Sequence, residues 1–305
     1  MIPLFSGKVK TKSIYCVIKT HGVILLKTQI FAVLGGDLRS AAAEKILSEN
    51  FETRLFGFDG ISEKTIEETL ENADFVLLPL PCTKDGKHLY TPFSKSETPL
   101  EKILMSPEKT IFFGANIPDK IKDGKHIFID IFARDDLKIL NAVPTAEGAI
   151  AEAILKTEKT LWESNCLVVG FGNIGKALAL RLKALGANVT VSARKPRDLA
   201  EISAFGMSPV ETANISEVLK DADIVFNTVP TEVIGKRELT AAKKDALFID
   251  LASKPGGIDF SFAEKAGISV LWLLSLPGKT APKTAGEIIA KTIFNILKGG
   301  EINGK

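Results

Sequence analysis

The fold of this chain follows from the stretch NCLVVGFGNIGKALALRLKALGANVTVSARKPR at residues 165–197. Its four apolar residues 166–169 predict a short buried strand, and residues 175–185 carry the apolar spacing of a helix. Between them lies the turn GFGNIG, residues 170–175, and a second strand is predicted at residues 188–192. This succession of strand, glycine turn, helix and strand predicts the βαβ unit that binds a dinucleotide.

Each glycine of the turn has its own role in such a site. Gly170 permits the tight turn, Gly172 lets a pyrophosphate approach the backbone, and Gly175 lets the helix pack closely on the strand. The first helical turn, with Asn173 and Ile174, offers unpaired N–H groups to the phosphate charge. We therefore expect a bound dinucleotide rather than a glycine-rich turn without a ligand.

The end of the second strand indicates which dinucleotide binds. NAD sites usually place an Asp or Glu there to bond the ribose 2′-hydroxyl, whereas this chain has SARKPR at residues 192–197. The segment has three cations and no acid, so it suits a 2′-phosphate. We predict NADP(H), with Ser192, Arg194 and Lys195 around that phosphate. A solvated basic turn without a ligand is the alternative.

The composition is that of a globular protein with room for two domains. The chain has 305 residues, of which 45% are hydrophobic and 25% charged, and its net charge is +2. This near balance of charge points to neither nucleic acid nor an anionic membrane as a partner. The three cysteines, Cys16, Cys82 and Cys166, are scattered and lack metal-ligand spacing. We expect no metal site and a cytoplasmic protein in a reducing compartment.

Residues 1–27 fit no element of the pattern that follows. Residues 14–26 are partly apolar, but Lys19 and His21 interrupt them, they are too short to span a membrane, and no signal cleavage site follows. We expect this leader to be an added strand or a disordered tail. Alternatively, the compact fold begins near Lys27.

The first domain opens at residue 30, and strands alternate with helices, which predicts a parallel sheet. Helices are expected at residues 39–47 and 62–70, the second capped by Ser62, and strands at residues 30–34, 52–56, 75–78, 110–113 and 127–131. The first turn, residues 35–37, contains two glycines, but Asp37 would repel a pyrophosphate. We therefore prefer a substrate-side role for this domain. Residues 83–96 are expected to form a loop, which either overhangs a cleft or is an ordinary surface loop.

The second domain follows a hinge. Residues 141–145 lead into a predicted helix at residues 146–155, between two α/β units. Beyond the glycine turn, a helix is expected at residues 259–266 and strands at residues 224–228, 247–251 and 269–274. The final helix, with isoleucines at helical spacing, is expected to pack back across the domain junction.

The predicted fold class is therefore α/β, with two Rossmann-like domains that have parallel sheets and a cleft between them. The N-terminal domain, residues 28–143, is flavodoxin-like, lies on the substrate side and is joined by the C-terminal helix 283–298. The C-terminal domain, residues 144–282, binds NAD(P).

Polar groups leave the carboxyl ends of three strands of the second domain. Asn227, Thr228 and Pro230 follow the fourth strand, where the nicotinamide half of a dinucleotide usually lies. The next two loops bring a basic and hydroxyl-rich set to one cleft mouth, namely Ser253, Lys254, Lys279, Thr280, Lys283 and Thr284. Such a set suits an anionic substrate, and ordinary turns with solvated lysines are the alternative.

Two further observations concern the chemistry. Arg134 follows the last strand of the first domain and is a candidate carboxylate clamp, unless it pairs with Asp135 or Asp136. Enzymes that oxidise 2-hydroxy acids on this plan use an imidazole of the coenzyme domain as acid and base, but all three histidines precede that domain. A lysine or a carboxylate must therefore transfer any proton. A Ser/His/Asp catalytic triad and a zinc site are excluded likewise, because no suitable His and Cys residues lie nearby.

Three longer runs are more specific than the glycine turn: PTAEG at residues 144–148, DLASKPGG at residues 250–257 and APKTAG at residues 281–286. Together with VLGGD at residues 33–37 and ARDD at residues 133–136, they make residues 29–297 resemble the A subunits of dipicolinate synthase from endospore-forming bacteria. Two positions depart from that family. At position 254 the family is expected to have Arg more often than Lys, and the lysine of this chain lacks the bidentate fork of a guanidinium group. At position 275 Gly is expected rather than Ser.

The resemblance implies NADP-linked oxidation of dihydrodipicolinate to pyridine-2,6-dicarboxylate, in the mother cell of a sporulating bacterium. It also implies a partner, the flavoprotein-like B subunit, and we expect the chain to form a homo-oligomer. A non-catalytic nucleotide-binding protein that supports the B subunit is the alternative. A shikimate-type or alanine-type dehydrogenase is a third interpretation that the two-domain plan permits.

On this hypothesis the substrate, a small dicarboxylate, lies in the interdomain cleft. Arg134 and Lys254 hold its carboxylates, with help from Ser253 and Thr280. A ring carbon gives up a hydride to the nicotinamide, and a base takes the accompanying proton. The candidate bases are Lys254, Lys283 and Glu147.

Overall fold

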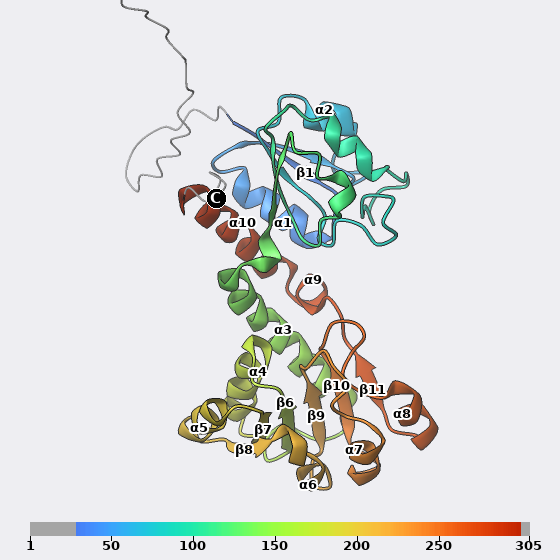
Figure 1. The fold of residues 1–305 in the computed structure, drawn as a ribbon, viewed down its shortest axis with the longest axis vertical. Coiled ribbons are helices and arrows are strands. Elements are labelled where there is room, and N and C mark those ends of the chain that lie inside the picture. Colours follow the sequence, from blue (N-terminus) through green and yellow to red (C-terminus); the bar gives the residue numbers. More distant parts are fainter. Residues whose placement is uncertain (1–28, 300–305) are drawn as a thin grey trace, which may run out of the picture.

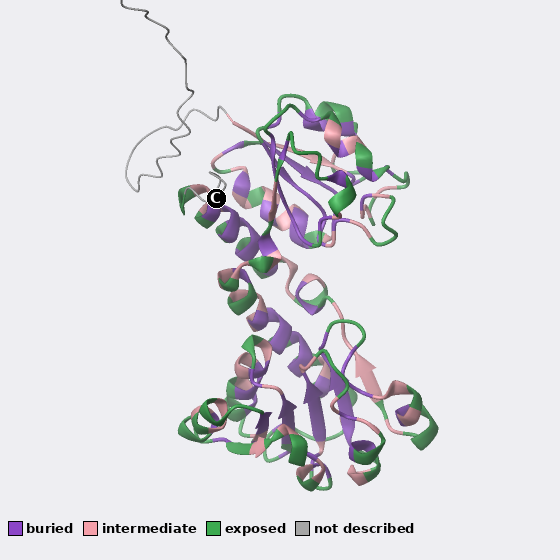
Figure 2. Cartoon of the chain, in the orientation of Figure 1, coloured by how far each residue is buried: buried purple, intermediate pink, exposed green. Residues whose placement is uncertain are grey.

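The computed structural model describes residues 29–299, so the predictions for residues 1–27 fall outside the described range. Two parallel sheets form two α/β domains, one above the other in Figure 1. The central strands of both sheets are buried, the edge strands of each sheet are half-buried or exposed, and the outer faces of the helices are exposed (Figure 2). These observations confirm the predicted fold class. No helix within the described range has the length and hydropathy needed to cross a membrane.

The first sheet has five parallel strands in the order β2-β1-β3-β4-β5. This is the flavodoxin-like order that the sequence predicts. Its strands are β1 (Ile30–Leu34), β2 (Glu52–Phe56), β3 (Phe75–Leu77), β4 (Ile111–Gly114) and β5 (Ile127–Asp130). Helix α1 (Leu38–Leu47) covers one face, and α2 (Ile66–Leu70) with the 3₁₀ turn η1 (Leu100–Met105) covers the other.

The second sheet has six strands in the order β11-β10-β9-β6-β7-β8. Counted within the domain this is the strand order 6-5-4-1-2-3 of dinucleotide-binding folds. Its strands are β6 (Asn165–Val169), β7 (Asn188–Ala193), β8 (Ser208–Glu211), β9 (Ile224–Asn227), β10 (Leu247–Asp250) and β11 (Val270–Trp272). One face packs on α4 (Asn173–Ala184) and α5 (Pro196–Ala204), and the other on α6 (Ser216–Leu219), α7 (Lys236–Ala241) and α8 (Phe260–Ala266).

Three helices form the junction between the two sheets (Figure 1): α3 (Asp135–Lys156), α9 (Leu276–Thr280) and α10 (Pro282–Gly299). The sequence predicts a hinge helix at residues 146–155, whereas α3 begins eleven residues earlier and contains Pro144. The last helix, α10, returns to the first sheet. There Ile289 and Ile293 share one apolar core with Ala43 and Leu47 of α1.

Two glycines of the family-specific runs permit these helices to cross closely. A Cβ atom on Gly286 of α10 would lie 2.6 Å from the Cβ of Ala42 and 2.7 Å from the carbonyl oxygen of Arg39 in α1. A Cβ atom on Gly148 of α3 would lie 2.8 Å from Oγ1 of Thr280 in α9. All three distances are shorter than real Cβ contacts, so any larger side chain would push the helices apart. The runs APKTAG and PTAEG therefore carry packing constraints of the junction.

Ser275 occupies a backbone conformation that suits glycine. It precedes α9 with φ 58° and ψ 33°, in the left-handed region, which costs an L-residue roughly 1 kcal/mol and glycine almost nothing. We expect Ser275→Gly to raise the free energy of unfolding by about 0.5–1 kcal/mol, measured by chemical denaturation. The matched control is Ser203→Gly in the last turn of α5, which should lower stability by about 0.5 kcal/mol. A comparable loss in both variants would contradict the prediction.

Candidate functional site

A cavity of about 670 Å³ lies at the carboxyl ends of β6, β7 and β9. Ligands of open α/β sheets bind outside these ends, where the strand order reverses. Here the reversal falls between β6 and β9. Most of the lining comes from four segments, namely the glycine turn, the loop after β7, the loop after β9 and the first half of α3, and Phe132, Asp198 and Thr212 complete it. We call it the dinucleotide cleft.

The glycine turn has the geometry that its sequence predicts. Gly170 has φ +99°, a region that L side chains rarely adopt. A Cβ atom on Gly175 would lie 2.1 Å from the carbonyl oxygen of Gly170, so this residue must be glycine for α4 to pack on the turn. A Cβ atom on Gly172 would meet nothing within 4 Å. Gly170 and Gly175 therefore shape the turn, and Gly172 leaves open the space next to it.

Helix α4 begins at the floor of the cleft. Gly172 is its N-cap and supplies no side-chain cap, and Asn173 and Ile174 form the first helical turn and line the cavity. The backbone N–H groups of a first turn have no partner within the helix and carry the positive end of the helix dipole. This arrangement suits a pyrophosphate.

The basic residues after β7 stand at one end of the cleft. Arg194 and Lys195 are exposed and line the cavity. Ser192 is fully buried instead, with its Oγ 3.4 Å from the backbone nitrogen of Gly170 and 3.4 Å from Oγ1 of Thr212. It braces the glycine turn from below, so the predicted contact of Ser192 with a 2′-phosphate does not match its position.

Thr212 is a cleft residue that sequence reasoning misses. It follows β8 and lines the cavity together with Arg194. The sequence pattern predicts no strand at β8, because its residues SPVE carry neither an apolar run nor clear alternation. Without that strand, nothing indicates that the next residue reaches the cleft.

Of the three residues predicted to contact the cofactor at the end of β9, two line the cleft and one does not. Thr228 and Pro230 line the cleft, and Oγ1 of Thr228 donates to the carbonyl oxygen of Val169 at 2.9 Å. Asn227 is fully buried, and its Nδ2 donates to Oδ1 of Asp250 at 2.8 Å and to the Val229 carbonyl oxygen. Asn227 therefore holds the loop in place through these hydrogen bonds and does not reach the surface of the cleft. This corrects the prediction that Asn227 contacts the cofactor.

Asp250 is the acceptor at the centre of these hydrogen bonds. It is fully buried, and its carboxylate accepts from the backbone N–H groups of Ala252 at 2.9 Å and Gly257 at 2.8 Å, besides Asn227. These bonds fix the loop of the DLASKPGG run. Its members Ser253 and Lys254 are exposed and do not line the cleft.

Helix α3 presents two different faces. Lys138, Asn141 and Thr145 line the cleft, and their spacing of three and four residues places them on one face. Glu147 lies two residues beyond Thr145 and therefore points elsewhere. It accepts from Nε of Arg181 in α4 at 3.2 Å and lines a separate groove between α3 and α4. The predicted base Glu147 is therefore outside the cleft.

Arg134 is also placed differently from the prediction. Its Nε donates to Oδ1 of Asp136 at 2.9 Å, and its second terminal nitrogen lies 3.3 Å from Oδ2. Nδ2 of Asn295 in α10 donates to the same carboxylate at 3.1 Å. The hydrogen bonds from Arg134 lower the pKa of Asp136 to about 2. Arg134 therefore pairs with Asp136, which is the alternative to its role as a carboxylate clamp. It does not line the cleft.

The remaining predicted residues belong to the junction. Oγ1 of Thr280 donates to the carbonyl oxygen of Leu276 at 2.9 Å, and its side chain lies next to Gly148 of α3. Lys283 is exposed in the first turn of α10. None of the four residues Arg134, Lys254, Thr280 and Lys283 lines the dinucleotide cleft.

The first turn of the first domain cannot hold a phosphate in this arrangement. The backbone N–H of Gly35 donates to Phe56 at 2.7 Å, and that of Gly36 donates to Tyr90 in the long excursion at 2.8 Å. Asp37 pairs with Arg39 at 2.8 Å, and Arg39 also donates to the carbonyl oxygen of Leu80. The groups that could face a phosphate are therefore occupied, and the substrate-side role of this domain stays a prediction.

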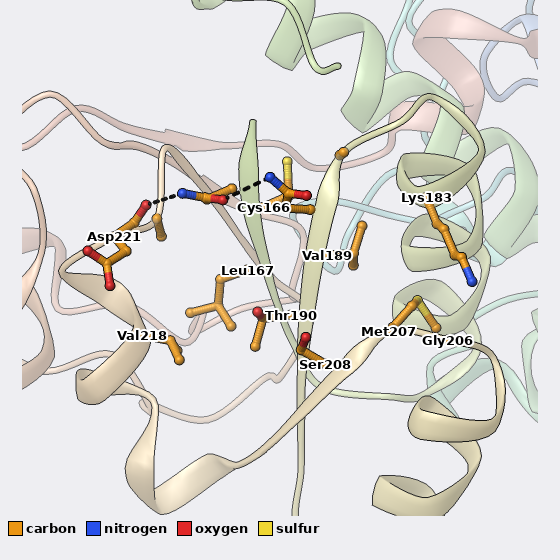
Figure 3. A pocket seen from close by; sticks show the side chains of 14 residues that line it. Cys166, Leu167, Lys183, Val189, Thr190, Gly206, Met207, Ser208, Val218 and Asp221 are labelled. Carbon is orange, nitrogen blue, oxygen red and sulfur yellow. Dashed lines mark hydrogen bonds between the residues drawn. The ribbon is translucent and has the colours of Figure 1, made fainter. Parts of the chain in front are cut away.

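A second cavity, of about 600 Å³, lies at the opposite edge of the second sheet (Figure 3). Cys166, Leu167, Val189 and Thr190 line it near the amino ends of β6 and β7, so it is not where an open sheet binds a dinucleotide. Burial raises the pKa of the Cys166 thiol to about 12, which keeps it from acting as a nucleophile. Within residues 29–299, no three His, Cys, Asp or Glu side chains gather as metal ligands.

Comparisons with known proteins agree with this geometry. The family model for the N-terminal domain of the dipicolinate synthase A subunit matches residues 30–125, and the NAD binding domain of D-isomer specific 2-hydroxyacid dehydrogenases matches residues 144–254. The A subunit of dipicolinate synthase from Bacillus subtilis (strain 168) is 36% identical over an alignment of 281 residues that covers 87% of this chain and 95% of that protein.

Two solved structures share the whole fold. The dipicolinate synthase A subunit from Bacillus halodurans superposes with a TM-score of 0.83 at 34% identity, over 90% of this chain and 99% of that chain. Its counterpart from Bacillus subtilis superposes with a TM-score of 0.81 at 34% identity, over 91% of this chain and 99% of that chain. The likeness therefore extends over both domains and the junction.

Proposed function

The chain belongs to the family of dipicolinate synthase A subunits, and on this premise we propose that it oxidises dihydrodipicolinate to dipicolinate with NADP as the hydride acceptor. The observation that carries the proposal is the dinucleotide cleft of about 670 Å³, with the glycine turn at its floor and Arg194 and Lys195 at one end. The substrate loses one hydride and one proton, which makes its ring aromatic. NADP, when bound, takes the hydride.

The chain's own residues would divide the cofactor among them. The first turn of α4, with Asn173 and Ile174, holds the pyrophosphate, and the open space beside Gly172 admits it. Arg194 and Lys195 hold the 2′-phosphate. Thr228 and Pro230 flank the nicotinamide half at the carboxyl end of β9.

The substrate would bind between this cleft and the first domain. Lys138, Asn141 and Thr145 line the cleft from α3 and offer polar contacts on the side of the junction. The exposed lysines Lys254 and Lys283 belong to the loop after β10 and to the start of α10. They are the proposed carboxylate partners and proton acceptors, because a primary ammonium pairs with carboxylate and a deprotonated amine accepts a proton.

We predict that Arg194 and Lys195 make the cofactor site specific for NADP. Replacing both by Ala should weaken NADP binding by at least about tenfold, since each charge-assisted hydrogen bond contributes roughly 1.5–3 kcal/mol, and should change NAD binding little. Fluorescence titration with each dinucleotide measures both affinities. Arg197→Ala is the control, since Arg197 is an exposed cation of the same segment that does not line the cleft. An equal loss for NAD and NADP would contradict the assignment.

A second candidate function is a nucleotide-binding protein that supports a catalytic B subunit. Its supporting observation is the position of Arg134 and Glu147, which pair with Asp136 and Arg181 and stand outside the cleft. The relatives are named as the A subunit of a synthase, which motivates the partner. In this case the chain binds NADP, and the redox step needs the second subunit.

The deciding experiment follows NADPH absorbance with the purified chain, NADP and freshly generated dihydrodipicolinate, with and without the B subunit. Reduction by the chain alone supports the dehydrogenase assignment. Reduction only when the B subunit is present indicates an active site that both chains share. Binding of NADP without reduction in either mixture supports the second candidate.

A further inference from the structure

Two loops that serve different parts of the proposed site meet at one buried side chain. Asn227 ends β9 and Asp250 ends β10, and the two residues are register partners in neighbouring parallel strands. The loop after β9 lines the dinucleotide cleft with Thr228 and Pro230, whereas the loop after β10 carries Lys254, which does not line it. Any influence of a bound cofactor on Lys254 must therefore pass from one loop to the other.

The Asp250 carboxylate joins the two loops through hydrogen bonds. Its Oδ1 accepts from Nδ2 of Asn227 at 2.8 Å and from the backbone N–H of Ala252 at 2.9 Å, and its Oδ2 accepts from the backbone N–H of Gly257 at 2.8 Å. All three partners are N–H donors, and a carboxylate, which offers only acceptors, satisfies them together. Ala252 and Gly257 flank the segment that carries Lys254, so Asp250 holds both of its ends.

Asn227 extends this link to the surface of the cleft. Its Oδ1 accepts from the backbone N–H of Val229 at 3.1 Å, and its Nδ2 donates to the Val229 carbonyl oxygen at 3.0 Å as well as to Asp250. Val229 lines the dinucleotide cleft. Asn227 and Asp250 are both fully buried, and a hydrogen bond in such a site is stronger than one in water. Two buried side chains therefore connect the lining of the cleft to the loop of Lys254.

Close packing leaves little room for the two loops to move separately. A Cβ atom on Gly257 would lie 2.3 Å from the carbonyl oxygen of Val229 and 2.4 Å from Nδ2 of Asn227. A Cβ atom on Gly256, whose φ is +92°, would lie 2.9 Å from Oδ2 of Asp250. The two glycines that end the DLASKPGG run thus allow the loop after β10 to lie directly on the loop after β9.

We propose that Asp250 is a positioning residue, which couples the loop that carries Lys254 to the loop at the nicotinamide half of the cofactor. The inference deepens the proposed function and rests on it, since that function assigns the cofactor to the cleft and Lys254 to the substrate. Asp250 acts through Asn227 on one side and through the backbone of the Lys254 loop on the other. Binding of NADP against the first loop therefore also fixes the second.

Hydrogen exchange measured by mass spectrometry on the full chain, with and without saturating NADP, tests this coupling without turnover. In the unaltered protein NADP should slow exchange at residues 228–233 and also at residues 251–257, in both by at least about fivefold, the lower end of typical coupling between sites. Asp250→Asn puts an amide donor where an N–H group needs an acceptor, so it should confine the slowing to residues 228–233. Asn227→Ala should do the same, and it carries the test if Asp250→Asn does not fold.

Asp223→Asn is the matched control. Asp223 lies just before β9, at the opposite edge of the same sheet, and it too joins separate segments by hydrogen bonds. It accepts from Nζ of Lys159 at 2.9 Å, from the backbone N–H of Asn165 at 2.9 Å and from Nζ of Lys243 at 3.1 Å. Its replacement should lower the unfolding temperature and leave the slowing by NADP at residues 251–257 unchanged.

Turnover gives a second measurement. With NADP, dihydrodipicolinate and the B subunit, Asp250→Asn should lower kcat by at least about tenfold, because it misplaces a group that acts on the substrate, and should change the KM for NADP less. The double variant Asn227→Ala/Asp250→Asn should lower kcat no further, since both changes break the same link. Losses that add would contradict a route through Asn227.

The exchange data separate this inference from the proposed function. Slowing at residues 228–233 alone in the unaltered protein would overturn the coupling and leave the cofactor site in place. So would slowing at residues 251–257 that persists in folded Asp250→Asn and Asn227→Ala. No slowing in either segment would mean that NADP does not bind in the cleft, which overturns the proposed function together with the inference.

Discussion

In the Gly175→Ala variant, the affinity for NADP is expected to fall by at least about a hundredfold, the equivalent of roughly 2.7 kcal/mol. The added Cβ would lie 2.1 Å from the carbonyl oxygen of Gly170 and 2.9 Å from its carbonyl carbon. Backbone atoms cannot yield as a flexible side chain can, so α4 must move away from the turn. The N–H groups of its first turn then no longer point at the pyrophosphate. The unliganded protein should also lose about 1–3 kcal/mol of unfolding free energy.

Gly172→Ala separates the two roles of glycine in this turn. A Cβ atom at Gly172 meets nothing within 4 Å, so the thermal unfolding temperature of the unliganded protein should stay within about 1 °C. Titration should nevertheless show weaker NADP binding, because the methyl group occupies the space of the pyrophosphate. If Gly172→Ala binds NADP normally, the pyrophosphate does not approach the backbone at this residue.

Gly286→Ala is expected to destabilise the first domain by about 3 kcal/mol, which corresponds to a fall of roughly 10 °C in the unfolding temperature. Ala stabilises a helix interior by about 1 kcal/mol over Gly, but here the methyl group would meet Ala42 at 2.6 Å and the backbone of Arg39 at 2.7 Å. The steric effect should exceed the helix propensity, because the contact lies at the crossing of α1 and α10.

Glu287→Ala provides the matched control for this prediction. Glu287 is the next residue of α10 and is exposed, so its replacement should change stability by no more than about 0.5 kcal/mol. Hydrogen exchange measured by mass spectrometry should show faster exchange of α1 and α10 in Gly286→Ala. Exchange that accelerates only in the second sheet would show that the crossing does not limit the stability of the first domain.

Much of the fold was predictable because its signals are local. Apolar runs such as residues 30–34 and 166–169 coincide with β1 and β6 to within one residue. Helix limits were less predictable. The sequence predicts a helix at residues 62–70 with Ser62 as its cap, but α2 begins at Ile66 and is capped by Thr65. Thr65 and Glu68 form a capping box, a pattern that was present in the sequence and outweighed the serine.

The start of α3 shows how packing can override a local signal. The residue before a proline is biased away from the helical region, so Pro144 favours a boundary, and the sequence predicts a helix only from residue 146. In the structure Ala142, Pro144 and Thr145 are buried within a continuous helix. Their burial outweighs the local cost of proline, and nothing in the sequence around Pro144 indicates this.

The residues of the candidate site show the same contrast between local signals and tertiary packing. The proposed cofactor residues of the glycine turn, with Arg194 and Lys195, come from one continuous βαβ segment and line the cleft, so their positions follow from the sequence. The positions of Arg134 and Glu147 depend on the rotation of α3 about its axis, which tertiary packing determines. Ser192 and Asn227 lie near the carboxyl ends of β7 and β9, as expected, but they are fully buried, because burial at a strand end depends on the neighbouring strands.

The return of α10 to the first sheet has a consequence for biosynthesis. The first domain is discontinuous in the chain, since its core contains β1 to β5 and also Ile289 and Ile293 of the last helix. Translation proceeds from the N-terminus, and domains generally fold as units as they emerge from the ribosome. Here the domain that emerges first cannot complete its core until α10, near the C-terminus, has been synthesised. Until then the face of α1 that later packs on α10 is exposed. The dinucleotide domain, inserted between its two parts, is therefore the one that can complete its fold while the chain is still attached to the ribosome.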